Sequence, residues 1–490
     1  MYHIERRPSG SNALVNTSTG ADVVAGDWDV RTSVHEYGGG AATAYDGRIY
    51  FSNAGDGRLY RVEEGRTPEP VTPGEFTLCH SDIVCQLICD TESTVHRFAD
   101  FSVYPNYQSG THLVSVLEDH TADTPQTVRN TLCVINTTTK LVSELQGIAE
   151  ADFFAAPAFS PDGTKLVWQQ WYHDMPWEGA ELYVADVIGI GSDSVSGLRV
   201  TNAKHIAGKK LDISAAYPSW ANNNTIVFTS DESGYQNPWT YSTSTNKAQP
   251  VFSSTRSEDF SGPAWTLGGS PYVIVDDSGN MALFAAFRDG RNVLYLVDLR
   301  DGTQREIEPC PFVTIGKLRR VAPGKPEIVF SASRSDGPGG VVQCTLSSLA
   351  ADATPAYTIL KSTEPSDSAS TQFPAGIISL PQPCMLHIPQ ENNLLPVIFY
   401  APTNPAYEGS SIPGEKPPCV IDVHGGKYHS LCPQRMSKSM SSSTSRPNRN
   451  AITSVELVHT VLYQSRMGLV CILALRNSEK NSFDISYFAC

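Results

Sequence analysis

Residues 158–168 read AFSPDGTKLVW, and Leu182-Tyr183-Val184 follows them after a short interval. The Asp162-Gly163 step supplies the positive φ angles that a tight hairpin requires. The apolar and β-branched residues after the turn are typical of β-strands. This stretch therefore predicts a β-hairpin followed by a further β-strand.

The same pairing of short β-rich runs recurs along the chain. Six units are visible, with cores at residues 49–52 and 59–62, 113–116 and 132–135, 166–168 and 182–184, 226–228 and 239–241, 281–287 and 294–297, and 328–330 and 341–344. From Tyr50 to Phe330 they cover 280 residues, or about 56 per unit, somewhat longer than a usual propeller blade.

Such a repeat predicts a β-propeller, because a four-stranded blade cannot bury both faces alone and must stack on its neighbours. The segment from Tyr2 to Val15 resembles the remains of one more unit. We therefore predict about seven blades with an incomplete first blade. An array of β-sandwiches is the alternative, although its units would be spaced less regularly.

Composition limits the function. The chain has 490 residues and a formal net charge of -15, which disfavours nucleic acid and anionic membranes as partners. The N-terminal residues lack an apolar signal region. The apolar stretch at residues 455–475 contains Glu456, His459 and Arg466, and such polar side chains disfavour a membrane-spanning helix. We expect a cytoplasmic protein whose oligomeric state the sequence leaves open.

Eleven cysteines are then expected to stay reduced. Their one local cluster, Cys79, Cys85 and Cys89 with His80, lacks the paired spacing of a zinc site. We predict no metal and no cofactor.

The composition changes after the repeats. Residues 350–372 are rich in Ala, Ser, Thr and Pro, and residues 377–380, 396–400 and 419–423 then read as strands. The last of these is apolar, as in a sheet buried on both faces. We predict a propeller over residues 1–365 and part of an α/β-hydrolase domain over 366–490. Within the second part, residues 437–450 are poor in apolar side chains, 455–464 have helical spacing, and 468–475 read as a buried strand.

Several motifs resemble one family. They are RTSVHEYGGGA at residues 31–41, the AFSPDG hairpin at 158–163, WYHDMPWEGAEL at 171–182, SDESGYQN at 230–237, YAPTNP at 400–405 and HGG at 424–426. Together they are similar to the prolyl oligopeptidase family of serine peptidases (peptidase family S9), in its acylaminoacyl-peptidase and dipeptidyl-peptidase branch.

The resemblance implies a Ser-Asp-His triad with its serine on a GxSxG elbow. The chain contains no GxSxG, and only 64 residues follow Gly426. Gly268-Gly269-Ser270-Pro271-Tyr272 is a partial match inside the propeller. We therefore predict no catalytic residues in this truncated chain.

By resemblance, the backbone N–H groups of Gly425 and Gly426 are oxyanion-hole candidates, with His424 supporting the loop. The alternative is a simple turn at the end of a strand. Lys427 stands where the family usually has proline, and the residues after it depart from the family pattern.

Two further groups invite a functional reading. His35 and Glu36 could form an acid–base pair, but adjacent residues of a strand point to opposite faces, so we expect a structural role. The aromatic residues Trp168, Trp171, Tyr172 and Trp177 could form a binding platform, but we expect them to pack within a blade.

Two functions compete on this evidence. One is a serine peptidase of short peptides, inactive in the chain as written. The other is a non-catalytic propeller that binds a peptide or a protein.

Overall fold

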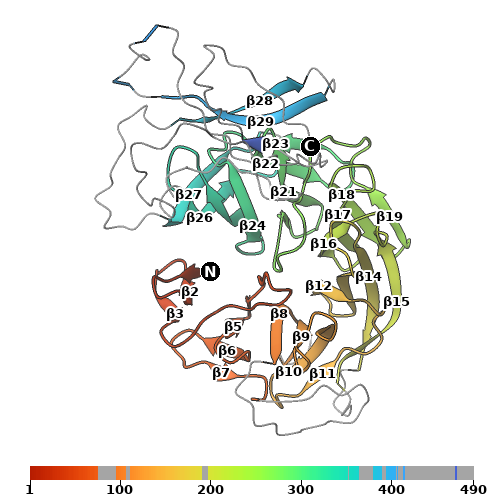
Figure 1. Cartoon of the computed structure of the whole chain (residues 1–490). Helices are drawn as coiled ribbons and strands as arrows, with labels where there is room; N and C mark the ends of the chain where they lie inside the picture. The colour runs from red at the N-terminus through yellow and green to blue at the C-terminus, as the bar shows by residue number, and fades with distance from the viewer. Residues whose placement is uncertain are drawn as a thin grey trace.

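A computed structural model describes residues 1–74, 95–105, 111–189, 197–350, 352–363, 379–388, 393–403, 405–406, 412–413 and 470–471. Seven antiparallel sheets follow one another around an axis (Figure 1). The predicted seven-bladed propeller with an incomplete first blade is confirmed, because the first sheet has three strands and the other six have four.

The strands follow the chain in order from blade to blade. Blade 1 has β1 (Tyr2–Arg6), β2 (Asn12–Asn16) and β3 (Asp22–Val24); blade 2 has β4 (Ala42–Tyr45), β5 (Arg48–Ser52), β6 (Leu59–Glu63) and β7 (Glu69–Pro70); blade 3 has β8 (His96–Val103), β9 (His112–Asp119), β10 (Arg129–Asn136) and β11 (Val142–Glu144); blade 4 has β12 (Phe153–Phe159), β13 (Lys165–Trp171), β14 (Glu181–Ile188) and β15 (Arg199–Ala207).

The last three blades repeat the same plan. Blade 5 has β16 (Ala215–Asn222), β17 (Thr225–Ser230), β18 (Asn237–Ser242) and β19 (Lys247–Pro250); blade 6 has β20 (Tyr272–Ile274), β21 (Met281–Arg288), β22 (Arg291–Asp298) and β23 (Gln304–Glu306); blade 7 has β24 (Thr314–Arg320), β25 (Glu327–Ser333), β26 (Gly340–Leu346) and β27 (Pro355–Ser362).

The six predicted strand pairs are the second and third strands of blades 2 to 7. These middle strands are buried on both faces, because each blade packs between two others. In β5, for example, Ile49, Tyr50 and Phe51 are all buried. The Asp-Gly turns were also predicted correctly: Asp46 and Gly47 have φ values of 49° and 76° in the two-residue turn between β4 and β5.

The apolar core is divided among the interfaces between blades. Six buried clusters join blades 1 and 2, 2 and 3, 3 and 4, 4 and 5, 5 and 6, and 6 and 7. Among the described residues, no such cluster joins blade 7 to blade 1. This seam has an ion pair instead, with Lys361 Nζ on β27 3.2 Å from Glu5 Oε2 on β1. A partly exposed pair of this kind stabilises by at most about 1 kcal/mol.

A contact across the middle of the ring compensates for the weak seam. The connection from blade 1 to blade 2 meets the connection from blade 5 to blade 6, and Leu267 donates its backbone N–H to the Gly38 carbonyl at 3.0 Å. Gly39 and Leu267 form an isolated parallel bridge. Gly40 also accepts the backbone N–H of Asp100 on β8, the innermost strand of blade 3, at 2.9 Å. Blades 2, 3 and 6 are thereby tied together at the axis.

The innermost strands share a backbone irregularity. In β8, β12, β16 and β24 a bulge interrupts the pairing with the second strand, and each bulge contains one residue with a positive φ. These residues are Asp100, Ala156, Tyr217 and Lys317, with φ between 49° and 58°. A bulge bends a strand and changes the direction of a side chain, so each of these blades has one altered position beside the axis.

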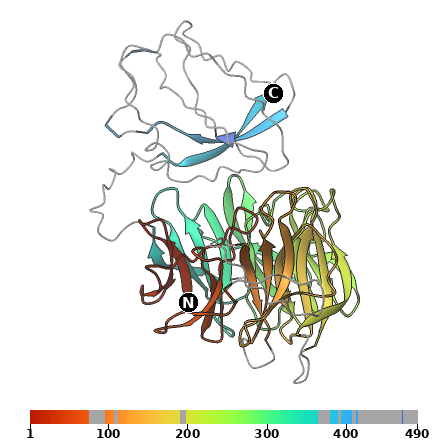
Figure 2. The same ribbon diagram turned by 60° about the horizontal axis from the view of Figure 1, so that its bottom comes forward.

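A separate sheet follows the propeller and lies to one side of the ring (Figure 2). β28 (Pro381–Ile388) pairs antiparallel with β29 (Asn393–Tyr400), which pairs parallel with β30 (Val470–Cys471). β29 contains the strand predicted at residues 396–400 and begins earlier, and β30 lies within the strand predicted at residues 468–475.

The prediction of a strand at residues 377–380 is wrong where it can be judged, because Ser379 and Leu380 precede β28. Pro381 and Pro383 explain the error, since a run with prolines argues against a strand. The described residues contain no helix long and apolar enough to cross a membrane.

Replacing Gly39 tests the central contact. A Cβ atom at Gly39 (φ 94°) would lie 2.2 Å from the Leu267 carbonyl oxygen, whereas one at Gly65 (φ 76°) would meet nothing within 4 Å. We expect Gly39→Ala to cost about 3 kcal/mol of unfolding free energy and Gly65→Ala about 1 kcal/mol, because both incur backbone strain but only Gly39 incurs the clash. Denaturant unfolding of the two variants measures the difference; equal losses would contradict a tight central contact.

Candidate functional site

The strand order defines which loops share a face of the propeller. Within a blade the strands alternate in direction, so the connections between blades and the loops between second and third strands lie on the face where β27 ends. We call this the exit face, because the chain leaves the propeller there towards β28. The residues of the 31–41 motif and the 171–182 motif contribute to it.

The 31–41 motif forms a left-handed turn and is not a strand. His35 and Glu36 have φ values of 54° and 63°, and Gly38 donates its backbone N–H to the Val34 carbonyl at 2.9 Å. The premise of our prediction for His35 and Glu36 was therefore wrong, although they still do not form an acid–base pair. Three quarters of the Glu36 side chain is exposed, whereas the His35 ring packs edge-on against Phe153 and Trp171.

The His35 ring has a strongly perturbed acidity. Burial lowers its pKa to about 4, and the charge of Glu118 opposes that shift only in part. Neither ring nitrogen makes a hydrogen bond of normal geometry among the described residues, although the side chain of Asn130 lies close enough to raise the pKa slightly against the effect of burial. The neutral imidazole therefore acts as a packing group, which agrees with the structural role that we predicted.

A compact ionic network lies beside this turn. The buried carboxylate of Glu118 accepts the backbone N–H of His35 at 3.0 Å and lies 3.2 Å from Arg97 Nη1 and 2.9 Å from His120 Nε2. Arg97 also binds Glu36 at 2.7 Å, and His120 Nδ1 lies 2.8 Å from Asp123. The hydrogen bond with His120 lowers the pKa of Asp123.

This network has the donor types that a metal ion requires. One ligand atom each from Glu36, Glu118 and His120 lies within 4.8 Å of the others. Each of these side chains already has a protein partner, so the network is satisfied without an ion. Its three carboxylates face one guanidinium and one imidazole, and each ring nitrogen of that imidazole lies against a carboxylate.

Three aromatic side chains form a second feature of the exit face, which we call the aromatic patch: Tyr37, Trp177 and Trp265. The ring of Tyr37 lies edge-on to Trp265 with centroids 4.6 Å apart, and Trp265 lies 6.4 Å from Trp177. Tyr37 is 54% exposed, which is unusual for a side chain on a strained and tightly held turn.

The expected packing role is confirmed for Trp168 and Trp171, which are buried in blade 4. Tyr172 lies beneath the ammonium group of Lys210, 4.0 Å from its ring centroid. Sequence reasoning placed Trp177 with these residues and missed Tyr37 and Trp265. Tyr37 and its ring partner Trp265 are far apart in the sequence, so no local pattern connects them. The local signal at Tyr37 was the run of glycines after it, which indicates an unusual turn.

The partial GxSxG match is not a nucleophile. Ser270 Oγ lies 2.9 Å from the carbonyl oxygens of both Tyr272 and Leu318, which share its single proton, and no histidine contacts it among the described residues. The oxyanion candidates Gly425 and Gly426, with His424, lie outside the described residues. The same is true of the cluster of Cys79, Cys85, Cys89 and His80.

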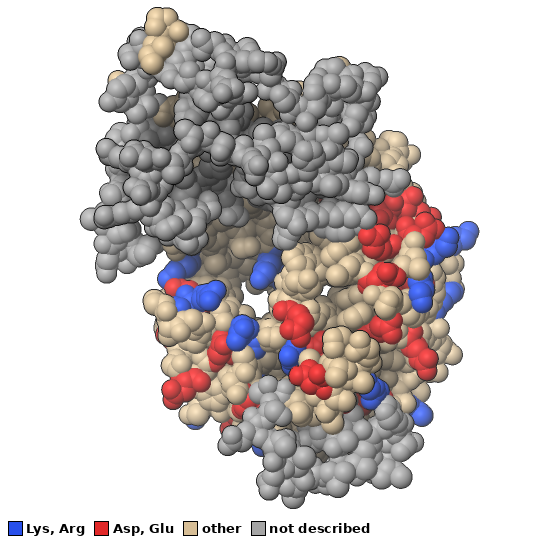
Figure 3. All heavy atoms as spheres, viewed as in Figure 1, with Lys and Arg blue, Asp and Glu red and all other residues tan. Residues whose placement is uncertain are grey.

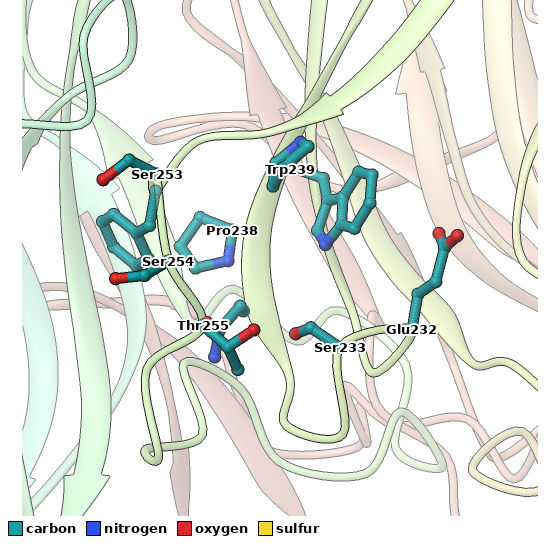
Figure 4. A pocket seen from close by; sticks show the side chains of 10 residues that line it. Glu232, Ser233, Pro238, Trp239, Ser253, Ser254 and Thr255 are labelled. Carbon is teal, nitrogen blue, oxygen red and sulfur yellow. The ribbon is translucent and has the colours of Figure 1, made fainter.

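Charged side chains surround an opening near the middle of the propeller (Figure 3). A cavity of about 320 Å³ lies elsewhere, at the outer part of blade 5 (Figure 4). Trp239 and Phe252 line it together with the hydroxyl groups of Ser233, Ser253 and Thr255. The Trp239 indole N–H has no acceptor among the described residues. This cavity has hydroxyl groups and one exposed carboxylate, Glu232, but its lining contains no histidine that could activate a hydroxyl group as a nucleophile.

Comparison with solved structures gives a clear relationship. The chain superimposes on a puromycin-hydrolysing peptidase from Mycobacterium tuberculosis with a TM-score of 0.71 and 26% identity, covering 89% of this chain and 61% of that one. The resemblance to the prolyl oligopeptidase family is thereby confirmed. A second match is to a puromycin hydrolase with 23% identity and a TM-score of 0.68. The aligned region covers 88% of this chain and 60% of that one, so the two proteins share the fold.

The chain thus spans about three fifths of the length of these peptidases. No protein-family model matches the sequence, and a search of curated proteins finds no match.

The perturbed acidity of His35 predicts a pH dependence. Its folded pKa of about 4 lies below the ordinary value of 6.5, so the unfolded chain takes up a proton first as the pH falls. Stability from this group is therefore complete above about pH 6.5 and is lost towards pH 4, at up to about 1.4 kcal/mol per pH unit. We expect His35→Asn, which tolerates a positive φ, to be less stable at pH 7 but to show a shallower loss between pH 6.5 and 4. Thermal unfolding at several pH values compares the two slopes; identical slopes would show that folding does not lower the pKa of His35.

Proposed function

We propose that this chain is the ligand-selecting propeller of a serine peptidase of the prolyl oligopeptidase type, and that its exit face binds short peptides and aminoacyl amides. The observation that carries the proposal is the match to a puromycin-hydrolysing peptidase over 89% of the chain. Puromycin is an amide that joins an aromatic amino acid to a nucleoside, so it is a suitable probe.

The exit face supports this proposal with two kinds of group. The aromatic patch offers ring surface to planar groups, and Tyr37 is its most exposed member. Aromatic pairs stabilise by about 0.5–1.5 kcal/mol beyond the area that they bury. The neighbouring carboxylates of Glu36 and Asp123 suit a ligand with positive charge.

We further propose that this polypeptide binds its ligands without cleaving them. The sequence contains no GxSxG elbow, and the hydroxyl of Ser270 is already bound to two carbonyl oxygens. A non-catalytic propeller that binds a protein is the second candidate, and the exposed ring of Tyr37 also supports it.

Serine-directed labelling tests the absence of catalysis. A fluorophosphonate probe reacts with a serine only where a base activates it, so we expect no covalent labelling of the full chain. Incubation with puromycin should likewise release no free amino acid. Covalent labelling at one serine, with turnover that disappears when that serine is replaced by alanine, would overturn this part of the proposal.

Puromycin binding tests the exit face. Quenching of tryptophan fluorescence should report binding, since two of the three rings of the aromatic patch are indoles. We expect Tyr37→Ala to weaken binding by about two- to tenfold, because it removes one stacking contact. Tyr37→Phe serves as the matched control and should retain affinity, because stacking requires the ring and not the hydroxyl. Equal affinities of the alanine variant and the wild type would exclude Tyr37 from the ligand site.

A further inference from the structure

Two cationic side chains of β24 lie beside the propeller axis without acidic partners. Lys317 occupies the bulge of this innermost strand, and Arg319 follows two residues later. Both remain exposed to solvent. Neither forms an ion pair among the described residues, although the neighbouring Arg320 does, with Asp277 at 2.8 Å.

The guanidinium of Arg319 is held in a fixed position. Nη1 donates to the Leu318 carbonyl at 2.9 Å, and Nη2 donates to the Gly268 carbonyl at 3.2 Å. Both acceptors are neutral, so they orient the group without compensating its charge. Its remaining N–H groups have no acceptor among the described residues. An arginine held in this way keeps a planar set of donors suited to carboxylate or phosphate oxygens.

The surrounding charges leave a positive excess. Asp100 on β8 is the one carboxylate whose charge acts on Arg319, and it already accepts the backbone N–H of Ala156 at 2.7 Å. Burial raises the pKa of Asp100, which weakens its tendency to carry a negative charge. Burial lowers the pKa of Arg319, and burial together with the charge of Arg319 lowers that of Lys317. Protein atoms therefore surround much of both cations although part of each side chain stays exposed. No carboxylate among the described residues forms an ion pair with either cation.

A cavity lies directly beside Arg319. It has a volume of about 340 Å³ and is formed by the innermost strands of blades 4 to 7, with Pro157, Tyr217, Ser270 and Arg319 among its lining residues. This volume falls within the range of small-ligand sites in proteins.

We infer that this cavity is an anion-binding site in which Arg319 holds a carboxylate or phosphate group. Lys317 lies on the same strand outside the lining, and its charge adds to the attraction. The oxyanion would accept hydrogen bonds from the remaining N–H groups of the guanidinium and supply a full counter-charge for it. Two sources share this chemistry: the terminal carboxylate of a bound peptide, and free inorganic phosphate. The inference does not depend on catalysis.

Thermal unfolding of the full chain in inorganic phosphate tests the site, with ionic strength held constant by sodium chloride. We expect phosphate to raise the unfolding temperature of the wild type in a saturable manner. Arg319→Gln should weaken the apparent affinity by about tenfold, since it removes a charged donor from the cavity. Lys317→Gln should weaken it by a smaller factor, about two- to threefold, since it removes only a neighbouring charge. Lys317→Gln keeps the test valid if Arg319→Gln destabilises the central contact, because Lys317 makes no hydrogen bond among the described residues. Arg320→Gln removes the same charge from the same strand and should behave like the wild type.

A second arm identifies the source of the anion. Fluorescence titration with a dipeptide that has a free C-terminal carboxylate, and with its C-terminal amide, separates the two. Tighter binding of the free acid, weakened in both variants, supports the site with a peptide carboxylate as its ligand. A phosphate effect that is weakened in the variants, with equal binding of acid and amide, supports the site with a free anion as its ligand. Equal stabilisation by phosphate in the wild type, Arg319→Gln and Lys317→Gln would overturn the inference.

Discussion

The close approach of Gly38–Gly40 to Leu267 and Gly268 at the axis is the contact on which the ring depends. Six interfaces between blades have an apolar core, but the described part of the seam between blades 7 and 1 has a partly exposed ion pair. Such a ring could open like a hinge at the seam. The central contact opposes that motion, because it joins blades on opposite sides of the axis through backbone groups that cannot move independently of their strands. Only glycine allows it, since a Cβ at Gly39 would clash with a carbonyl oxygen.

The same segment places the candidate ligand groups, so closure of the ring and recognition are coupled. The glycines follow directly after His35, Glu36 and Tyr37, and the first two residues have left-handed backbone angles. Each such residue costs of order 1 kcal/mol, which the burial of the His35 ring and the hydrogen bond to Glu118 offset. Because both ends of the segment are fixed, Tyr37 remains exposed beside Trp265 and does not collapse onto the propeller.

The sequence predicted those parts of the fold that local pattern controls. Middle strands are mostly apolar, and Asp-Gly turns lie between or before the strands of several pairs, so all six pairs were recognisable. Outer strands such as β19, Lys247–Pro250, are exposed and leave no such pattern. Innermost strands contain bulges, and β28 contains prolines, so both depart from regular alternation. The meeting of Gly39 with Leu267 and of Tyr37 with Trp265 joins residues of different blades, and a single sequence contains no signal for such pairs.

The bulges explain how one backbone can present different chemistry at the axis. Asp100, Tyr217 and Lys317 occupy equivalent bulges in blades 3, 5 and 7, with nearly the same φ. The blade is held mainly by its middle strands and by the apolar clusters between blades, although Tyr217 also packs against the cluster of blades 5 and 6. The side chain at the bulge is acidic in blade 3, aromatic in blade 5 and basic in blade 7, while the backbone conformation stays nearly the same. The backbone therefore fixes these positions beside the axis, and the side chains that occupy them decide whether the space around Arg319 attracts an anion or repels it.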